Sequence, residues 1–284
     1  MALSVRPATA ADRTAVLAIS AQIWEGHDYL PKFFDRWVRE GQFWVGVERG
    51  QAVGCGKATQ FARGEWWLEG LRVDQRLTGR GLGTALSRAI LARALDLRPS
   101  SLRLATADVN EASIHIIEKM GFRVLYSSRL FGCRVRPAAG GNGAELDAAS
   151  PAEALDFLSR STEFAVNHGL LHHTWQFRSA TLRHVRELCR SGRVFGTRER
   201  GRLSGLLILR PHRYEPRDLD ICLAEGSPRS VEQMRRFVLA RARDSGSKWI
   251  EAMACGELMQ RAVRRMGLRP DREVKAVPVY EYPI

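Results

Sequence analysis

The stretch Thr78-Gly79-Arg80-Gly81-Leu82-Gly83-Thr84 decides the fold of the first half of this chain. It follows residues 66–73, which are typical of a strand, and it precedes apolar residues at helical spacing over 85–91. Glycines let a backbone approach an anion closely, and the N–H groups and dipole at a helix start favour negative charge. We therefore predict a pyrophosphate-binding loop between a strand and a helix.

Other glycine-loop motifs fit this stretch less well. No Gly-Lys-Ser or Gly-Lys-Thr follows it, so it is not a P-loop. A dinucleotide-binding unit begins with a parallel strand–helix–strand unit, whereas the strands predicted here at 43–48 and 53–61 form a hairpin around Arg49-Gly50. Because glycines also form ordinary tight turns, the loop needs support from the rest of the chain.

The remaining patterns of the first half predict a complete α/β domain. In order, they are a strand at 5–7, a helix from Thr9 to Trp24, a break at 26–28, a short helix from Pro31, the hairpin, the strand and helix around the glycine loop, a strand at 102–106, a helix from Asn110 to Gly121, and a last hairpin over 122–135. We expect residues 1–137 to form the catalytic domain and the glycine-rich residues 138–149 to be a linker.

Residues 150–284 repeat this pattern more faintly. Strands are predicted at 194–198, 203–209, 219–223 and 249–253, with helices at 231–242 and 258–266. Met266-Gly267-Leu268-Arg269 echoes Met120-Gly121-Phe122-Arg123. The repeat indicates an internal duplication, although an unrelated α+β domain would give a similar pattern.

The order of elements resembles the GNAT superfamily of N-acetyltransferases. The resemblance rests on Leu71-x-Val73 leading into Gly79–Leu86, and on Asn110 followed by Glu118-Lys119-Met120-Gly121-Phe122. It covers residues 1 to about 136. It implies an α/β fold with a mixed sheet, namely a GNAT domain followed by a second, degenerate GNAT-like domain.

The resemblance also implies acetyl-CoA as a cosubstrate. The residues that would bind it are Leu71, Arg72, Val73, Thr78, Gly79, Arg80, Gly81, Leu82, Gly83, Thr84 and Asn110. The loop Ala224-Glu225-Gly226-Ser227-Pro228-Arg229 of the second half has lost the glycine spacing, so we expect one CoA site.

A narrower resemblance is to the histidine N-acetyltransferase group. It is suggested by Val16–Ser20, Asp28-Tyr29-Leu30-Pro31, Glu69–Val73 and a Tyr-containing strand at 279–282. It implies a free amino acid or another small amine as acceptor, acetylated by direct attack on the thioester in a ternary complex.

Glu69 is the candidate general base, because most free amines are protonated at pH 7. On a regular strand Glu69 shares a face with Leu71 and Val73. Asp28 and Tyr29 are candidates for binding the ammonium and carboxylate of the acceptor. The structural alternatives are that Glu69 is a surface residue, that Asp28 caps a helix, and that Tyr29 packs.

The chain departs from the family pattern at two positions. Thr78 stands where Arg or Gln is usual, and Arg76 and Arg80 are candidates to supply the missing charge. Ile117 stands where the family has a tyrosine that protonates the leaving thiolate. Water or Tyr126 is the replacement that we consider.

Composition excludes several other classes. The net charge of +13 is scattered rather than gathered into basic blocks, so nucleic acid is not an expected partner. The five cysteines include no C-x-x-C pair, and the adjacent His172 and His173 diverge on any regular element, so we expect no metal site. No apolar run approaches about 18 residues, so we expect a cytoplasmic protein without a membrane partner.

Three functions remain open from the sequence alone. The leading one is a small-molecule N-acetyltransferase, and the others are a protein N-acetyltransferase and a weakly catalytic acyl-CoA-binding regulator. The acceptor and the oligomeric state, including a homodimer, are not decided by the sequence.

Overall fold

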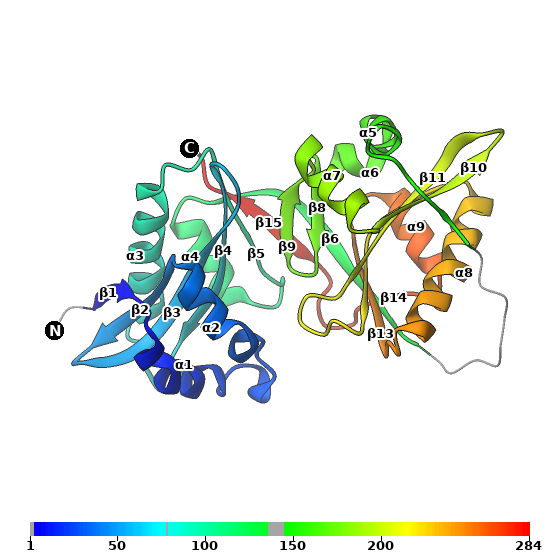
Figure 1. Cartoon of the computed structure of the whole chain (residues 1–284). Helices are drawn as coiled ribbons and strands as arrows, with labels where there is room; N and C mark the ends of the chain where they lie inside the picture. Colours follow the sequence, from blue (N-terminus) through cyan, green and yellow to red (C-terminus); the bar gives the residue numbers. More distant parts are fainter. Residues whose placement is uncertain (1–2, 78, 136–144) are drawn as a thin grey trace. The chain divides into compact units, whose positions relative to one another are not determined.

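The computed structural model describes residues 3–77, 79–135 and 145–284 (Figure 1). The fold is of the predicted mixed α/β class. The chain forms two compact units, which we call unit 1 and unit 2. Unit 1 comprises Met1–Leu104, Glu111–Arg123 and Tyr280–Ile284, and unit 2 comprises Ala105–Asn110 and Val124–Val279.

Unit 1 contains a sheet with the strand order β1-β2-β3-β4-β5, followed by the end of β15. Its elements are β1 (Ser4–Pro7), α1 (Arg13–Ser20), α2 (Leu30–Glu40), β2 (Phe43–Glu48), β3 (Gln51–Ala62), β4 (Glu65–Val73), α3 (Leu82–Asp96), β5 (Ser101–Ala105), α4 (Glu111–Lys119) and β15 (Val277–Glu281). The predicted hairpin of β2 and β3 is confirmed, as are the strand and helix around the glycine loop.

The two faces of the unit 1 sheet carry different helices. A Cβ added to Gly56 of β3 would lie 2.4 Å from the side chain of Ile90 on α3. The next residue, Lys57, points to the opposite face, where its Nζ lies 3.9 Å from Glu40 on α2. We call these the α3 face and the α2 face. The buried cluster on the α3 face includes Leu86, Leu102 and Ile117.

Unit 2 contains a second mixed sheet, with the strand order β6-β13-β12-β11-β10-β7. Its elements are β6 (Arg123–Arg134), β7 (Asp147–Ala148), α5 (Pro151–Arg160), α6 (Thr162–Val166), β8 (Leu170–His173), β9 (Gln176–Ser179), α7 (Leu182–Arg190), β10 (Val194–Glu199), β11 (Arg202–Pro211), β12 (Leu219–Gly226), α8 (Pro228–Asp244), β13 (Trp249–Ala254), α9 (Glu257–Arg265) and β14 (Arg269–Pro270). The strands and helices predicted after residue 190 are all present.

The predicted hairpin over 122–135 is wrong. Residues 123–134 form one long strand, β6, because residues 123–131 contain no Gly, Pro, Asn or Asp to turn the chain. Its antiparallel partner is β13, with register from Trp249↔Arg134 to Ala254↔Arg129. A strand distant in sequence thus takes the place of the expected hairpin arm.

The domain division also differs from the boundaries 1–137 and 150–284. Most of β6 belongs to unit 2, whereas the last five residues of the chain belong to unit 1. There the N–H of Tyr282 donates to the carbonyl of Leu102 on β5 at 2.9 Å. The division differs because strand pairing, rather than position along the chain, assigns these segments. Most of the predicted linker lies outside the described residues.

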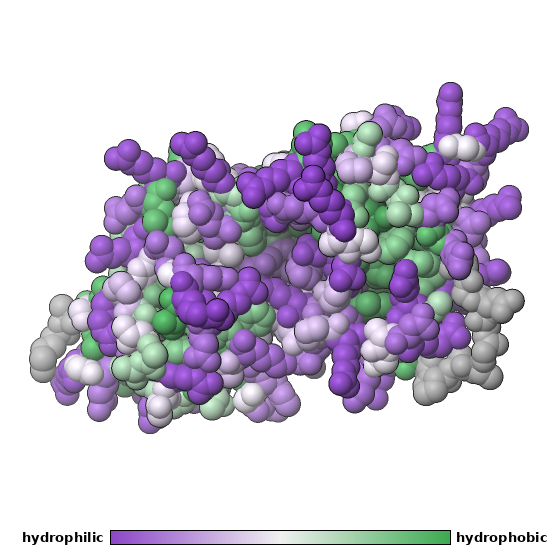
Figure 2. All heavy atoms as spheres, viewed as in Figure 1, coloured by the Kyte–Doolittle hydropathy of each residue, from purple (hydrophilic) through white to green (hydrophobic). Residues whose placement is uncertain are grey.

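The surface of both units is largely polar on the side seen in Figure 2. Within the residues that the structure describes, no helix has both the length and the apolar character needed to cross a membrane.

Candidate active site

The parallel pair of β4 and β5 parts after three residues. Its register runs from Glu65↔Ser101 to Trp67↔Arg103 and then stops, although β4 continues to Val73. Backbone groups along the rest of β4 are therefore not used by β5. The carboxyl ends of parallel strands are common ligand sites in α/β proteins.

A β-bulge at Gly70 lies in this part of β4. The register with β3 runs from Lys57↔Glu69 to Cys55↔Arg72, so β4 holds one extra residue. Gly70 has φ +67°, and a Cβ there would lie 2.6 Å from the ring of Trp37 on α2. Only glycine fits this backbone and this close approach.

The bulge contradicts the prediction that Glu69 shares a face of the strand with Leu71 and Val73. Glu69 pairs with Lys57 and lies on the α2 face, whereas Leu71 and Val73 pack against the cluster on the α3 face. The extra residue reverses the alternation of side chains after Gly70. The signal available in the sequence was a glycine inside a strand, which often marks a bulge.

The Glu69 side chain is half-buried and lies among polar groups. The Thr59 hydroxyl on β3 donates to Glu69 Oε1 at 2.5 Å. The adjoining Lys57 side chain is buried, and its Nζ donates to the carbonyl of Ala58 at 2.8 Å. These groups orient Glu69 at the bulge, next to the point where β4 leaves β5.

Arg72 lies on the same face, on the other side of the bulge. Its Nε and Nη2 donate to the two carboxylate oxygens of Asp28 at 2.9 and 2.8 Å. Its Nη1 donates to the Leu71 carbonyl at 2.8 Å. The guanidinium carbon lies 4.7 Å from the ring centroid of Trp24 and 5.3 Å from that of Tyr29. Arg72 is thus held by one ion pair and two aromatic rings.

Burial by itself would lower the pKa of Arg72, but Tyr29 and Asp28 outweigh it and raise this pKa. The guanidinium therefore stays charged. Trp24 is 58% exposed, and both Trp24 and Glu25 have left-handed φ values, of 46° and 55°. Such backbone conformations are uncommon for non-glycine residues and are found at functional sites.

Asp28 has a different place from the one predicted. Besides Arg72, its carboxylate accepts hydrogen bonds from the Ser20 hydroxyl at 2.7 Å and the Leu30 N–H at 3.4 Å. Both oxygens of this buried carboxylate therefore already accept hydrogen bonds from the protein. The bond from the Leu30 N–H agrees with the alternative that Asp28 caps the following helix. Asp28 is a positioning residue for Arg72, and Tyr29 packs against Phe33 and Trp37 as well as against Arg72.

The glycine loop has the geometry expected of an anion site. Gly79 and Gly81 have φ values of +83° and +74°, and an added Cβ at either would meet nothing within 4 Å. Gly81 directly precedes α3, and no side chain caps that helix. The N–H groups of its first turn, which includes Leu82, Gly83 and Thr84, are thus open to an external acceptor. Thr78 lies outside the described residues.

The two arginines expected to add charge to the loop are paired with acids. Arg76 donates through Nε to Asp74 at 2.9 Å, and this hydrogen bond lowers the pKa of Asp74 to about 2. Arg80 lies 3.0 Å from Glu48. The backbone and the helix start, rather than free arginine charge, are the main features that favour an anion here.

The other predicted residues lie on elements other than the loop. Asn110 directly precedes α4 and is grouped with unit 2. Ile117 is 5% exposed and belongs to the core of unit 1. Tyr126 is buried in unit 2, where its ring stacks on His168 and meets Phe177 edge-on. This packing gives Tyr126 a structural role within unit 2.

Unit 2 also has a parallel strand pair that parts early, but hydrogen bonds within the protein occupy the backbone N–H groups at the end of this pair. Its parallel pair β12–β13 has register only from Leu219↔Ile250 to Ile221↔Ala252. At the carboxyl end of β13, Glu163 accepts the N–H groups of Cys255 and Gly256 at 2.7 and 2.6 Å. These N–H groups lie at the start of α9.

The loop before α8 is closed as well. The Ser227 hydroxyl caps α8 by accepting the Ser230 N–H at 3.2 Å, and Pro228 has no N–H to offer. The anion-binding features of unit 1 are thus replaced in unit 2 by internal hydrogen bonds.

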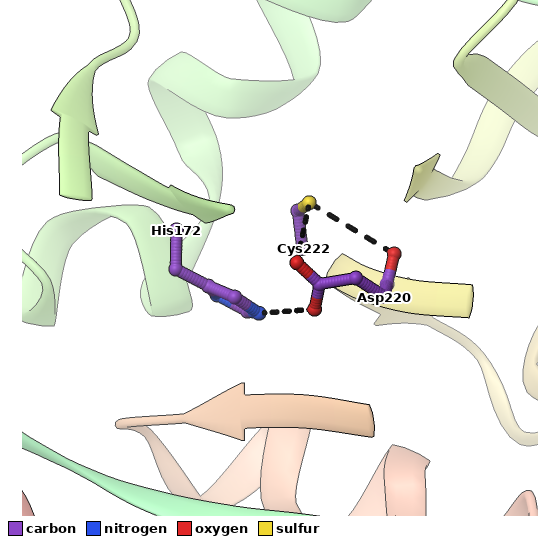
Figure 3. A group of neighbouring side chains, drawn as sticks. All are labelled: His172, Asp220 and Cys222. Atoms are coloured by element: carbon purple, nitrogen blue, oxygen red, sulfur yellow. Dashed lines mark hydrogen bonds and ion pairs between the residues drawn. The ribbon is translucent and has the colours of Figure 1, made fainter. Parts of the chain in front are cut away.

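One group of described side chains has the composition of a metal site. His172, Asp220 and Cys222 have ligand atoms within 4.8 Å of one another, and all three are buried (Figure 3). His172 Nε2 lies 3.1 Å from Asp220 Oδ1, and Asp220 Oδ2 accepts the Thr174 N–H. The Met253 N–H donates to the same His172 nitrogen at 3.2 Å.

These contacts engage the donor atoms of His172 and Asp220 within the protein. Burial alone would raise the pKa of Asp220, but His172 outweighs it, and this pKa is lowered to about 2. The group therefore fits a charged hydrogen-bond cluster that ties β8 to β12. His173 points elsewhere and lies 3.0 Å from the Pro211 carbonyl, so the two histidines do diverge.

The parted strands and the open start of α3 are features that suit an anionic ligand. Residues 13–122 match the model of the acetyltransferase (GNAT) family. This part of the chain is therefore similar to a GNAT acetyltransferase domain, and that family transfers acyl groups from acetyl-CoA. No curated protein matches the chain.

Solved structures resemble the chain over nearly its whole length. A GCN5-related N-acetyltransferase from Sphaerobacter thermophilus shares 16% identity over 98% of this chain and 95% of its own, with a TM-score of 0.62. One from Kribbella flavida shares 14% identity over 99% and 70%, with a TM-score of 0.51. At these identities the likeness shows the fold alone.

A third similar structure is the glucosamine N-acetyltransferase region of a fungal multi-domain GH3 β-N-acetylglucosaminidase. It shares 13% identity over 99% of this chain and 38% of its own, with a TM-score of 0.66.

Proposed function

We propose that this protein acetylates the amine of a small molecule, namely a free amino acid such as histidine or a related amine. One observation carries the proposal. Glu69 and Arg72 lie on the same face of β4, on either side of the Gly70 bulge and beside the point where β4 and β5 part. A base and a cation at this spacing suit an acceptor that bears both an amine and a carboxylate.

The donor side of the proposed site is the glycine loop and the edge of β4. Acetyl-CoA supplies the acyl group as a thioester. The open N–H groups after Gly81 would bind its pyrophosphate. Backbone N–H groups over 71–73, which β5 does not use, would hold the rest of the donor and the carbonyl oxygen on which charge develops.

Glu69 would accept a proton from the acceptor ammonium, directly or through one water. This proton transfer makes the nitrogen lone pair available, so that the amine attacks the carbonyl carbon. The C–N bond forms and the C–S bond breaks, with the electron pair leaving on sulfur. The nitrogen, which is cationic after the attack, then loses its second proton to water. The contribution of the protein is orientation of the two substrates, proton acceptance and stabilisation of the oxyanion.

Arg72 would bind the acceptor carboxylate. Its bonds to Asp28 and Leu71 fix the guanidinium plane, and they leave other N–H groups of the fork available. Trp24 and Tyr29 add aromatic surface around it. Aromatic walls suit a flat side chain such as imidazole.

A screen of acceptors by release of the CoA thiol tests the proposal. We expect turnover with one or more free amino acids, and a large loss when the acceptor carboxylate is amidated, as in histidinamide. Polyamines and a short unblocked peptide serve as comparisons. Turnover with the peptide alone would instead indicate a protein N-acetyltransferase.

A further inference from the structure

The C-terminal strand β15 brings a buried tyrosine into unit 1. Tyr280 is 2% exposed and belongs to the same buried cluster as Ile117, Leu104 and Phe122. No hydrogen bond joins its hydroxyl to another described residue. The hydroxyl oxygen is not among the described polar atoms that lie fully buried without a partner, so the ring is buried while its oxygen is not fully enclosed by protein.

The position of Tyr280 along the sheet follows from two backbone hydrogen bonds. The Tyr282 N–H donates to the Leu102 carbonyl, and the Thr106 N–H donates to the Pro278 carbonyl. In an antiparallel ladder these bonds place Tyr280 opposite Leu104. Residues directly opposite each other share a face, so Tyr280 lies on the α3 face with Leu104.

Leu104 is the first residue of β5 beyond the last pair with β4, Trp67↔Arg103. Tyr280 is therefore level with the point where the strands part. This is the place where the proposed function puts the thioester. On the same face lie α3, which begins at the glycine loop, and α4, which carries Ile117 and Glu118.

We propose that Tyr280 is the general acid of the reaction and that its hydroxyl protonates the sulfur of the departing CoA. This inference rests on the proposed function. As the acceptor nitrogen bonds to the carbonyl carbon, the C–S bond breaks and its electron pair goes to sulfur. The sulfur takes the proton from Tyr280 Oη, and the phenolate then regains a proton from water.

The surroundings of Tyr280 keep it in the donor form. Burial raises the pKa of the hydroxyl, and the charge of Glu118 raises it further. The ordinary pKa of a thiol is about 8.5, below that of the phenol, so full proton transfer is uphill by itself. The neutral phenol stabilises the forming thiolate by a hydrogen bond, and water replaces the proton that the phenol gives up. The proton therefore has a source although position 117 is an isoleucine.

Tyr280→Phe tests the role, and Tyr282→Phe is its matched control. Tyr282 follows the end of β15 and lies on the same face, but it packs against Phe122 at 5.1 Å between ring centroids. We expect Tyr280→Phe to lower kcat with acetyl-CoA by about 10²-fold, with the Kd for CoA and the thermal midpoint little changed. Tyr282→Phe should keep near-normal turnover.

A change of leaving group separates acid catalysis from a packing role. The acetyl thioester of 4-nitrothiophenol releases a thiolate that needs no proton, so Tyr280→Phe and the unaltered protein should use it at equal rates. A packing defect would slow both donors alike, and that result would overturn the proposal.

A readout without turnover is the pKa of the CoA thiol in its complex, followed by the ultraviolet absorbance of the thiolate. A hydrogen bond from Tyr280 stabilises the thiolate, so we expect a lower thiol pKa in the unaltered protein than in Tyr280→Phe. Equal values would contradict the inference. If CoA does not bind at all, the proposed function fails instead.

Discussion

Arg72 and Asp28 form a two-point ion pair across 44 residues of sequence, with both hydrogen bonds shorter than 3 Å. The pair joins β4 to the break between α1 and α2 and holds the guanidinium against Trp24 and Tyr29. The orientation of Arg72 therefore depends on a residue that the sequence pattern assigned to the substrate.

We expect Asp28→Asn to weaken acceptor binding and stability together. Removing one partner of a buried ion pair leaves an uncompensated charge, which costs about 3 kcal/mol. The acceptor KM should rise about tenfold while the Kd for CoA stays constant. Asp12→Asn is the matched control, because it breaks the Arg6–Asp12 pair elsewhere in unit 1 and should leave KM unchanged. An unchanged KM in Asp28→Asn would contradict this role for Arg72.

Gly81→Glu should abolish tight CoA binding. The new carboxylate would stand at the open start of α3, where the pyrophosphate is proposed to bind, and like charges repel. We expect the Kd measured by calorimetry to rise more than tenfold. Gly192→Glu is the control, because Gly192 also has a positive φ and open space around it, but it lies in unit 2 after α7. Equal losses in the two variants would show a general effect of charge or strain.

Glu69→Gln keeps the shape of the side chain and removes its basicity. We expect turnover to fall by about 10²- to 10⁴-fold at pH 7, the usual reach of general base catalysis, with CoA binding little changed. The rate should recover at high pH, where the acceptor amine is already neutral. Thr59→Val, which removes the hydroxyl bonded to Glu69, should cause a smaller loss. Normal turnover of Glu69→Gln at pH 7 would refute the role.

The closed site of unit 2 predicts one CoA per chain. Titration calorimetry of the unaltered protein should give that stoichiometry, and a value of two would contradict it.

Glu163→Gln should weaken the bonds to the Cys255 and Gly256 N–H groups and lower the free energy of unfolding by about 1–3 kcal/mol. Denaturant unfolding measures this loss, and the Kd of unit 1 for CoA should not change.

Acid should destabilise unit 1 through Asp12. The hydrogen bond from Arg6 lowers the pKa of Asp12 to about 2. Because the pKa in the folded state lies below the unfolded value near 3.9, the contribution is present above about pH 4 and is lost as the pH falls to 2. We expect a loss of about 2 kcal/mol over this range, and a weaker pH dependence of urea unfolding in Asp12→Asn. An equal dependence in both proteins would refute this account.

Local signals in the sequence predicted much of the fold. The turn at Arg49-Gly50, the loop at Gly79–Gly83 and the helix end near Gly121 are present where expected. Each depends on contacts between residues close in the chain, or on a backbone conformation that favours glycine. The GNAT resemblance of residues 1 to about 136 agrees with the family match over 13–122.

The candidate site was predicted less completely. Glu69 was identified, but its face was wrong, because the Gly70 bulge adds one residue to β4. Arg72 was predicted only as one of the CoA-binding residues. The contacts of its side chain with Asp28 and Trp24 depend on how β4 packs against the break between α1 and α2. A guanidinium reaches its partner across space, and no short-range pattern marks that partner.

The order of the local elements, together with the glycine loop, was enough to predict a GNAT-like domain, because each of these patterns depends on residues close in the chain. Which segments complete each sheet became clear only in the folded chain. β6 runs on as a single strand paired with β13, and the last residues of the chain join β5. Strand pairing between distant segments depends on backbone hydrogen bonds that every residue but proline can donate, so the sequence holds no specific mark of it.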